Sequence, residues 1–366
     1  MKLLIAARPF AFHGGVERAT AGLVSALVRH GHDVHLLTLP GQTPIAGVTV
    51  RALPLPRLPA VARVLVFARA VRRAARAGGF DIVQSHERTL GQHVYRAGEG
   101  CHRAYLAAMG RAPRGLHHRL MLALERRVFA TTPHIVAIAR AGAAEIQRLY
   151  GVPRGRVSVV YNGVDLERFH PRGRAGHAAQ VRGEAGLPAG VPVLLFVGSG
   201  FARKGLATAV EALAKLGDPS ARLVVIGKGD AAPYRSLADR LGVAERVAWL
   251  APRADVERWY AGADVVVLPT RYEPFGNVHL ESLACGVPVV TTTAAGGAEV
   301  IEEGRNGSVV PPGDASAVAA GVETLLAQPR ERVADAARRS AEPFTYDAQV
   351  AGFIAVYGAV RAASGD

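Results

Sequence analysis

The chain has 366 residues, of which 49% are hydrophobic and 20% charged, and its formal net charge is +14. This length exceeds what one hydrophobic core usually organises, so we expect two domains of similar size. The apolar content excludes a disordered chain, and two cysteines, Cys101 and Cys285, are too few for a disulfide framework or a zinc site. The N-terminal apolar run is too short for a signal peptide or a membrane span, which favours a cytoplasmic protein.

The positive charge is concentrated in the first half of the chain. Residues 1–176 hold 26 Lys and Arg against 9 Asp and Glu, a balance of +17, whereas residues 177–366 hold 18 against 21, a balance of −3. Such a field attracts an anionic partner, for example a phosphorylated glycan, an acidic lipid surface or a nucleic acid. We expect no nucleic acid, because aromatic residues are not interleaved with the basic clusters and no known binding module is present.

Short apolar runs alternate with segments of helical period, which is typical of parallel sheets with crossover helices. In chain order, the first set of predicted elements is a strand at 2–7, a helix at 16–29, strands at 34–39 and 82–84, a helix at 115–130, a strand at 135–138, a helix at 141–150 and a strand at 157–160. Residues 171–190 are rich in Gly, Arg, Pro and Ala without a sustained period, so we place a linker there.

The same rhythm returns after the linker. The second set comprises strands at 192–197, 223–226, 265–268 and 287–291, helices at 204–216, 233–241, 278–285 and 315–327, and a last apolar-periodic segment at 346–360. The pattern predicts the α/β class, with two Rossmann-like, doubly wound domains facing across a cleft. We expect the domains at residues 1–175 and 176–340, and a C-terminal helix in 341–366 that packs back on the first domain.

Open α/β sheets bind ligands at the carboxyl ends of their strands, so the loops that follow the strands are the candidate sites. After the first strand, Gly14 and Gly15 open a helix, where backbone amides can approach an anionic group closely. A tight strand-to-helix turn would explain these glycines equally well.

A second candidate loop, residues 198–205, reads GSGFARKG. Arg203 and Lys204 stand at the start of a predicted helix, where the helix dipole disfavours cations, and a bound diphosphate would offset that cost. The alternative is a pair of solvated basic residues.

The third candidate loop, residues 269–277, reads PTRYEPFGN and leads into a predicted helix. Glu273 and Glu281 are eight residues apart, about two helical turns, so both carboxylates can face one cleft. Each carboxylate can accept hydrogen bonds from neighbouring hydroxyls, as in a hexose or a ribose. Taken alone, the two residues could also be a charge at a helix N-terminus and an exposed side chain.

Together these residues resemble the retaining glycosyltransferases of family 4, which have the GT-B fold and an E-x7-E signature, here Glu273 through Glu281. The resemblance also covers residues 14–15, 162–165, 203–204, 227–229 and 296–299. It implies that Arg203 and Lys204 hold the diphosphate of a nucleotide sugar, with Gly15 approaching from the other domain. Ser199 stands where many members have Arg, and Arg203 would supply the missing cation.

The same resemblance assigns the sugar and nucleoside contacts. Glu273 would bind hydroxyls of the transferred sugar and Glu281 the ribose. The loop that begins at Gly198 would bind the donor as well, and the pocket for sugar and phosphate would be lined by the amides of Phe275, Gly276 and Asn277.

A narrower resemblance, carried by residues 198–205 and 94–103, is to lipopolysaccharide core α-1,3-glucosyltransferases that add glucose to heptose I. In those enzymes an acidic residue, usually Asp, occupies the place of Glu99 near the reacting centre, and other family members use His in that vicinity. Glu99 is therefore a candidate, with His102 behind it. This resemblance implies UDP-glucose as donor and inner-core heptose as acceptor. Another glycolipid or polysaccharide acceptor, or a hydrolysing nucleotide-sugar epimerase of the same fold, is the alternative.

No Asp-x-Asp motif stands at a predicted strand end, so we expect neither a metal nor a cofactor other than the donor. In residues 60–77, four arginines at i, i+3, i+4 and i+7 share one helical face opposite apolar residues. This pattern favours peripheral binding to the cytoplasmic face of an inner membrane, although an ordinary crossover helix would show it too. The arginines are Arg69, Arg72, Arg73 and Arg76, and the apolar residues are Val61, Val64, Leu65, Ala68 and Val71. A second basic cluster suited to acceptor phosphates comprises Arg111, Arg114, His117, His118, Arg119, Arg126 and Arg127.

Overall fold

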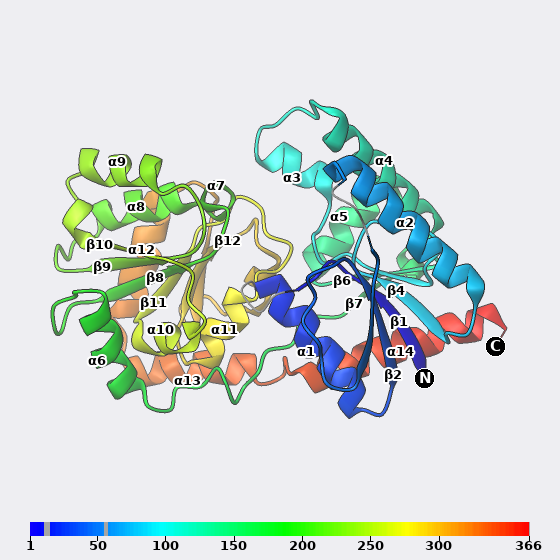
Figure 1. Ribbon diagram of the computed structural model, residues 1–366. Coiled ribbons are helices and arrows are strands. Elements are labelled where there is room, and N and C mark those ends of the chain that lie inside the picture. Colours follow the sequence, from blue (N-terminus) through cyan, green and yellow to red (C-terminus); the bar gives the residue numbers. More distant parts are fainter. Residues whose placement is uncertain (11–14, 55–57, 366) are drawn as a thin grey trace. The chain divides into compact units, whose positions relative to one another are not determined.

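The computed structural model describes residues 1–10, 15–54 and 58–365, and the chain divides into two compact units (Figure 1). Unit 1 comprises Met1–Gly163 and Tyr346–Asp366, and unit 2 comprises Val164–Thr345. The two places where the chain changes unit lie side by side, because Val164 and Thr345 form an isolated parallel bridge. Among the described residues, no helix is long and apolar enough to cross a bilayer.

The described part of unit 1 contains one parallel sheet of seven strands in the order β3-β2-β1-β4-β5-β6-β7. The strands are β1 Lys2–Ala6, β2 Asp33–Thr38, β3 Val48–Ala52, β4 Ile82–Ser85, β5 Val94–Arg96, β6 His134–Ala137 and β7 Val157–Val159. The helices are α1 Gly15–Arg29, α2 Ala60–Ala77, α3 His102–Ala108, α4 Leu116–Thr131, α5 Arg140–Tyr150 and α14 Tyr346–Ser364, with a 3-10 turn η1 at Arg154–Arg156.

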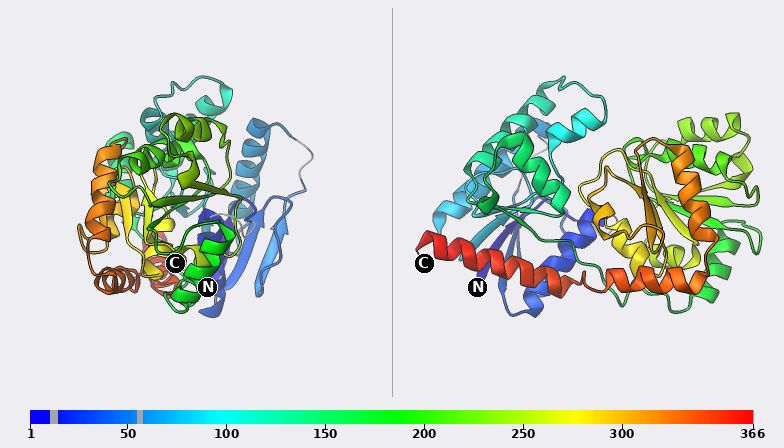
Figure 2. Two further views of the ribbon diagram at one scale, coloured as in Figure 1. Left: turned by 90° about the vertical axis from the view of Figure 1, so that its left-hand side faces the viewer. Right: turned by 180° about the vertical axis from the view of Figure 1, so that it is seen from behind.

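Both faces of this sheet are covered by helices, because successive strand residues point to opposite sides. Leu3 and Ile5 of β1 belong to one core cluster with residues of α1 and α14, whereas Leu4 and Ala6 belong to another with residues of α2. Figure 2 shows α14 running beside α1, and its Phe353 is fully buried. The C-terminal helix is therefore part of the core of unit 1.

In unit 2, the described residues form a parallel sheet of six strands in the order β10-β9-β8-β11-β12-β13. The strands are β8 Val193–Val197, β9 Arg222–Ile226, β10 Val247–Leu250, β11 Val265–Leu268, β12 Val289–Thr292 and β13 Gly307–Val310. The helices are α6 Arg174–Glu184, α7 Phe201–Lys204, α8 Leu206–Lys215, α9 Ala232–Arg240, α10 Val256–Gly262, α11 Val278–Ala284, α12 Ala315–Leu326 and α13 Arg330–Ala341, with 3-10 turns η2 Ala244–Arg246 and η3 Gly296–Val300.

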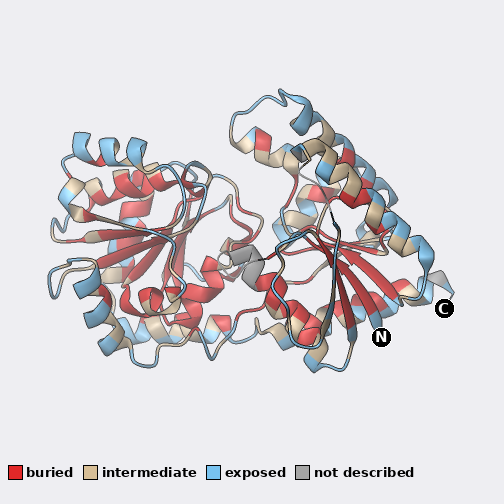
Figure 3. Ribbon diagram, in the orientation of Figure 1, coloured by how far each residue is buried: buried red, intermediate tan, exposed pale blue. Residues whose placement is uncertain are grey.

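The helices of unit 2 form two layers, one of α8, α9 and α12 and the other of α6, α10, α11 and α13. Figure 3 shows that the inner strands of both sheets are buried, whereas the outer helix surfaces are exposed, as is most of the edge strand β3. The strand order of unit 2 reverses between β8 and β11, which makes the carboxyl ends of these two strands the expected ligand site.

The predicted linker at residues 171–190 contains a helix, α6, that packs on α10 within unit 2. Val181 of α6 is buried against Gly262, where an added Cβ would lie 2.4 Å from the Val181 side chain. The contacts place the change of unit at Gly163, twelve residues before the boundary that the sequence predicts at residue 175. The sequence of α6 has too few apolar residues to reveal its packing face.

Candidate active site

Two loops at the carboxyl ends of β8 and β11 bring Arg203, Lys204 and Glu273 together. The Arg203 Nη1 donates to a carboxylate oxygen of Glu273 at 2.7 Å, and the Lys204 Nζ lies 2.5 Å from the same oxygen. The backbone carbonyl of Arg203 accepts from the Arg271 amide at 2.8 Å and from the Thr270 hydroxyl at 2.9 Å. The three charged side chains named from the sequence are therefore one cluster, held by hydrogen bonds between the loops.

The cluster carries one positive charge in excess, because two cations share one carboxylate. Burial alone would raise the pKa of Glu273, but Lys204 and Arg203 outweigh it and lower this pKa to about 2. Glu273 is therefore ionised at neutral pH and can only accept hydrogen bonds. The Arg203 side chain is 30% exposed, so a ligand can reach its guanidinium.

Glycines allow these loops to approach each other. Gly205 has φ +76°, and an added Cβ would lie 1.9 Å from the carbonyl oxygen of Pro269. Gly276 has φ +85°, and its Cβ would lie 2.9 Å from the Cγ of Glu273. Gly198 borders the lysine, because a Cβ there would lie 3.3 Å from the Cε of Lys204.

The remaining candidates of unit 2 lie in the same loop and on α11. Glu281 is 4% exposed and accepts a hydrogen bond from the Tyr260 hydroxyl at 2.8 Å. Phe275 is fully buried, and its carbonyl accepts from the Gly297 amide at 2.8 Å. Asn277 directly precedes α11.

His279 is a buried support of this loop that the sequence reasoning did not single out. Burial, with a smaller contribution from Lys204, lowers the pKa of His279 to about 4, so the ring is neutral at neutral pH. Its Nδ1 lies 2.7 Å from the Gly276 carbonyl, and because a carbonyl only accepts, Nδ1 carries the proton. The feature of the sequence that could have indicated this role is the position of His279, three residues after Gly276 and in the first turn of a helix.

Glu99 belongs to unit 1, in the loop after β5, and also sits between two cations. Its carboxylate accepts from the Arg88 Nη1 at 2.8 Å and pairs with Arg8. Arg8 also donates to Glu87 at 2.8 Å. Burial raises the pKa of Glu99, but Arg8 and Arg88 outweigh it and hold this pKa below its usual range. Glu99 is therefore an acceptor of hydrogen bonds and not a proton donor at neutral pH.

A buried ion pair holds the two candidate site residues of the loop after β5 and of α3, Glu99 and His102. Arg88 and Glu125 have side chains 5% and 1% exposed and lie 3.0 Å apart. Glu125 also accepts from the backbone amides of His102 at 2.5 Å and Arg103 at 3.1 Å, so it holds the start of α3. Because Arg88 contacts Glu99 as well, one pair orients the carboxylate of Glu99 and the helix that carries His102. The sequence did not reveal Arg8, Arg88 or Glu125.

The structure describes only one of the two glycines predicted as a site after β1. Gly14 lies outside them, and Gly15 is the first residue of α1. Among the residues that the structure describes, no group of three or more His, Cys, Asp and Glu could hold a metal ion.

Helix α2 departs from the membrane-binding pattern that its sequence favours. The four arginines are exposed, but Ala68 and Val71 are buried, and Val71 packs with Phe67 in a core cluster beneath the helix. At these positions the apolar face covers the sheet of unit 1 and is not available to a bilayer. The amphipathic period thus reflects a crossover helix with a charged outer face.

The two Rossmann-like sheets, with a cation–carboxylate cluster where the strand order reverses, define a glycosyltransferase of the GT-B class. Residues 13–168 match the family model described as Glycosyltransferase Family 4, and residues 191–328 match the one described as Glycosyl transferases group 1. The D-inositol 3-phosphate glycosyltransferase of Xylanimonas cellulosilytica is 31% identical over 381 residues, which cover 94% of this chain and 91% of that protein. The chain belongs to glycosyltransferase family 4.

Solved structures have the same fold. WaaG, a glycosyltransferase involved in lipopolysaccharide biosynthesis, superposes with a TM-score of 0.83 at 25% identity, covering 97% of this chain and 99% of that one. HepE of Anabaena in complex with UDP-glucose superposes with a TM-score of 0.77 at 20% identity, covering 97% and 100%. The predictions of the GT-B fold, of a glycosyltransferase and of family 4 are confirmed. The hydrolysing epimerase is not favoured, because these relatives are named as transferases.

Proposed function

We propose that this glycosyltransferase moves a hexose, in the first instance glucose from UDP-glucose, to a hydroxyl group of an anionic acceptor. The observation that carries the proposal is the cluster of Arg203, Lys204 and Glu273, in which two cations share one ionised carboxylate at the reversal point of a doubly wound sheet.

In this proposal, Arg203 and Lys204 bind the diphosphate and offset the charge that develops on it as the sugar leaves. Glu273, kept ionised by the same two cations, accepts hydrogen bonds from hydroxyls of the transferred sugar. Glu281 accepts from the ribose, with Tyr260 fixing its carboxylate. The loop at Gly198 and the amides of Phe275, Gly276 and Asn277 line the pocket.

We propose that the reaction retains the anomeric configuration. The bond between the anomeric carbon and the diphosphate oxygen breaks, and the bond to the acceptor oxygen forms on the same face. The acceptor hydroxyl gives its proton to the departing diphosphate oxygen. Glu99, ionised and held by Arg88, orients the acceptor by accepting a hydrogen bond from a hydroxyl next to the reacting one, with His102 nearby on α3. No metal takes part in this scheme.

We infer that the acceptor carries phosphate. The basic clusters of unit 1 support an anionic acceptor. Two similar proteins point to different examples of that chemistry: WaaG acts in lipopolysaccharide biosynthesis, and the Xylanimonas relative is named for D-inositol 3-phosphate. Phosphorylated inner-core heptose is our first acceptor, and inositol phosphate is the second.

We further propose that the enzyme works at the cytoplasmic face of an inner membrane, bound peripherally. The exposed arginines of α2 can meet anionic headgroups without insertion of the helix. Leu116, at the start of α4, is 72% exposed between the exposed Arg114 and Arg119, which suits an anionic lipid interface.

The test of the donor site is transfer by purified enzyme from a panel of nucleotide sugars to both acceptors. We expect Lys204→Ala and Glu273→Gln each to lower kcat on the order of 10²–10³-fold, because each removes a preorganised partner of the reacting donor. Lys215→Ala, which changes an exposed lysine at the end of α8, is the matched control and should leave kcat unchanged. The reaction should proceed equally well in EDTA.

Near wild-type turnover of both Lys204→Ala and Glu273→Gln would overturn these assignments, provided that circular dichroism shows both variants folded. Consumption of the donor without added acceptor would instead indicate hydrolysis. Loss of activity in EDTA that added divalent metal restores would contradict the metal-free scheme.

A further inference from the structure

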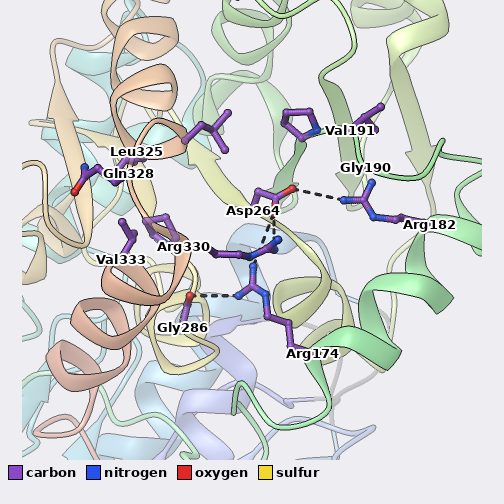
Figure 4. Close-up of a pocket in the computed structure, with 13 residues that line it drawn as sticks. Arg174, Arg182, Gly190, Val191, Asp264, Gly286, Leu325, Gln328, Arg330 and Val333 are labelled. Atoms are coloured by element: carbon purple, nitrogen blue, oxygen red, sulfur yellow. Dashed lines mark hydrogen bonds and ion pairs between the residues drawn. The ribbon is translucent and has the colours of Figure 1, made fainter.

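Unit 2 contains a polar cavity at the end of its sheet opposite to Glu273. Its walls include residues that precede three strands: Pro192 before β8, Asp264 before β11 and Pro288 before β12. The cavity has a volume of about 320 Å³. In Figure 4, the side chains of Arg174, Arg182 and Arg330 converge on Asp264.

Three guanidinium groups share this one carboxylate, so the wall carries an excess of two positive charges. Asp264 is already engaged closely, because it lies 2.5 Å from Arg330 and accepts from the Val193 amide at 2.8 Å. Arg182 and Arg174 lie 3.7 Å and 4.0 Å from its oxygens, beyond hydrogen-bond distance. Arg174 and Arg182 donate instead to neutral backbone carbonyls, of Gly286 and Ala263 and of Pro188 respectively, so neither has an anion at hydrogen-bond distance.

Arg174 is only partly satisfied by these contacts. Among the described residues its Nε has no hydrogen-bond partner, although this atom is buried. Burial, and next the charge of Arg330, lower the pKa of Arg174 to about 10. Arg174 and Arg330 are also the first residues of α6 and α13, where the helix dipoles disfavour cations. A second anion would relieve all three costs.

We propose that this cavity binds the phosphate group of a small phosphate monoester, separately from the nucleotide-sugar donor. Guanidinium groups present paired donors that match phosphate oxygens, which makes Arg182 and Arg174 the principal contacts. Val191, Leu325 and Val333 line the same cavity and would cover the carbon part of the ester. Inorganic phosphate presents the same kind of oxygen atoms to the arginines, and the experiment distinguishes it from a phosphate monoester.

Such a ligand would bridge α6 and α13, since Arg174 and Arg182 lie on the first and Arg330 on the second. Helix α6 follows Val164 and helix α13 precedes Thr345, and these two paired residues mark the places where the chain changes unit. Binding would therefore restrain both helices where the chain passes between its units.

The test is calorimetric titration and thermal unfolding of the full chain with inorganic phosphate and with phenyl phosphate. Ionic strength is held constant with chloride, and saturating UDP occupies the donor site. We expect saturable binding that stabilises the protein. Arg182→Gln and Arg330→Gln should each weaken it about tenfold or more, since each removes a charged hydrogen-bond partner. The matched control is Arg332→Gln, an exposed residue on α13 outside the cavity, which should bind like the wild type.

The sharpest variant is Asp264→Asn. If the cavity binds phosphate, loss of the competing carboxylate should tighten binding, and phosphate should restore stability lost by the substitution. Tighter binding of phenyl phosphate than of phosphate supports the ester, whereas equal affinity assigns the site to inorganic phosphate. The proposal is overturned by equal responses of Arg182→Gln and Arg332→Gln, by a response that UDP abolishes, or by an Asp264→Asn variant that phosphate neither binds nor stabilises.

Discussion

Glu99 and Glu273 each lie between two cations, one carboxylate in each unit, and this arrangement decides their protonation. In both cases burial favours the neutral acid, and the neighbouring cations outweigh it. The sequence predicted Glu273 near Arg203 and Lys204, because all three closely follow strands whose carboxyl ends form the expected ligand site. It could not place Arg8 beside Glu99, 91 residues away, because that contact depends on how β1 and β5 lie in the sheet.

Arg8→Gln tests the ionisation of Glu99. Arg8 lowers the pKa of Glu99, so its removal should raise that pKa. Because the proposed role needs the ionised form, activity should then be lost at a higher pH as the pH falls. The acid limb of the pH profile of kcat/KM should therefore move to higher pH, while the plateau changes little.

Glu87→Gln is the control for this prediction. Arg8 pairs with Glu87 as well as with Glu99, so removal of the Glu87 charge leaves Glu99 as the sole carboxylate partner of Arg8 in this pair. The acid limb should stay in place or move to lower pH. A shift of both variants in the same direction would show that the limb does not report on Glu99.

At the scale of elements, the active loops of unit 2 depend on a close approach that only glycine permits. Gly205 and Gly200 flank α7, and both have positive φ, but only Gly205 faces backbone, at Pro269. The sequence indicated a turn here, and the contact between the two loops became visible only in the structure.

Gly205→Ala should therefore be far more damaging than Gly200→Ala. Both substitutions place Ala in a left-handed conformation, which costs about 1–2 kcal/mol. At Gly205 the new Cβ would also collide with the Pro269 carbonyl, which raises the loss of unfolding free energy to roughly 3 kcal/mol or more and displaces Arg203. Denaturant unfolding of the two variants measures the difference, and equal losses would contradict the steric argument.

Helices α2 and α6 show that the residue pattern of one helix does not predict the surface on which that helix packs. The period of α2 predicted an amphipathic helix correctly, but the same apolar stripe serves a sheet or a bilayer, and in the structure it covers the sheet. Helix α6 has little apolar period, yet it folds because Val181 enters the space above Gly262. Both outcomes depend on a partner that is distant in sequence.

At the scale of the whole molecule, the positive charge of the first half of the chain belongs to unit 1. Unit 1 holds 24 Lys and Arg against 9 Asp and Glu, a balance of +15, and unit 2 holds 20 against 21, a balance of −1. The anionic partner is therefore expected on unit 1, where the exposed arginines of α2 and the start of α4 lie.

Binding to vesicles tests this expectation with the full chain. The protein should bind vesicles that contain phosphatidylglycerol, bind neutral vesicles weakly, and dissociate as salt is raised, because screening shortens the reach of exposed charges. Replacing Arg69, Arg72, Arg73 and Arg76 by Gln should weaken binding at least about tenfold, since each basic residue near such a surface contributes about 1 kcal/mol. The matched control replaces four exposed arginines of unit 2, Arg240, Arg305, Arg332 and Arg339. Equal weakening by both sets, or binding that ignores salt and lipid charge, would contradict the assignment.

The sequence by itself determined the α/β class, the two doubly wound sheets, the family and the grouping of Arg203, Lys204 and Glu273. The class and the two sheets follow from local period, the family follows from the resemblance of the motifs, and the grouping follows from the rule that loops at strand ends meet at one edge of a parallel sheet. Only the tertiary structure decided which cations hold Glu99, that Tyr260 contacts Glu281 and His279 contacts Gly276, that α6 belongs to unit 2, and that three arginines surround Asp264. Those contacts join residues far apart in the chain, and a short window of sequence carries no record of which distant side chains will share a buried space.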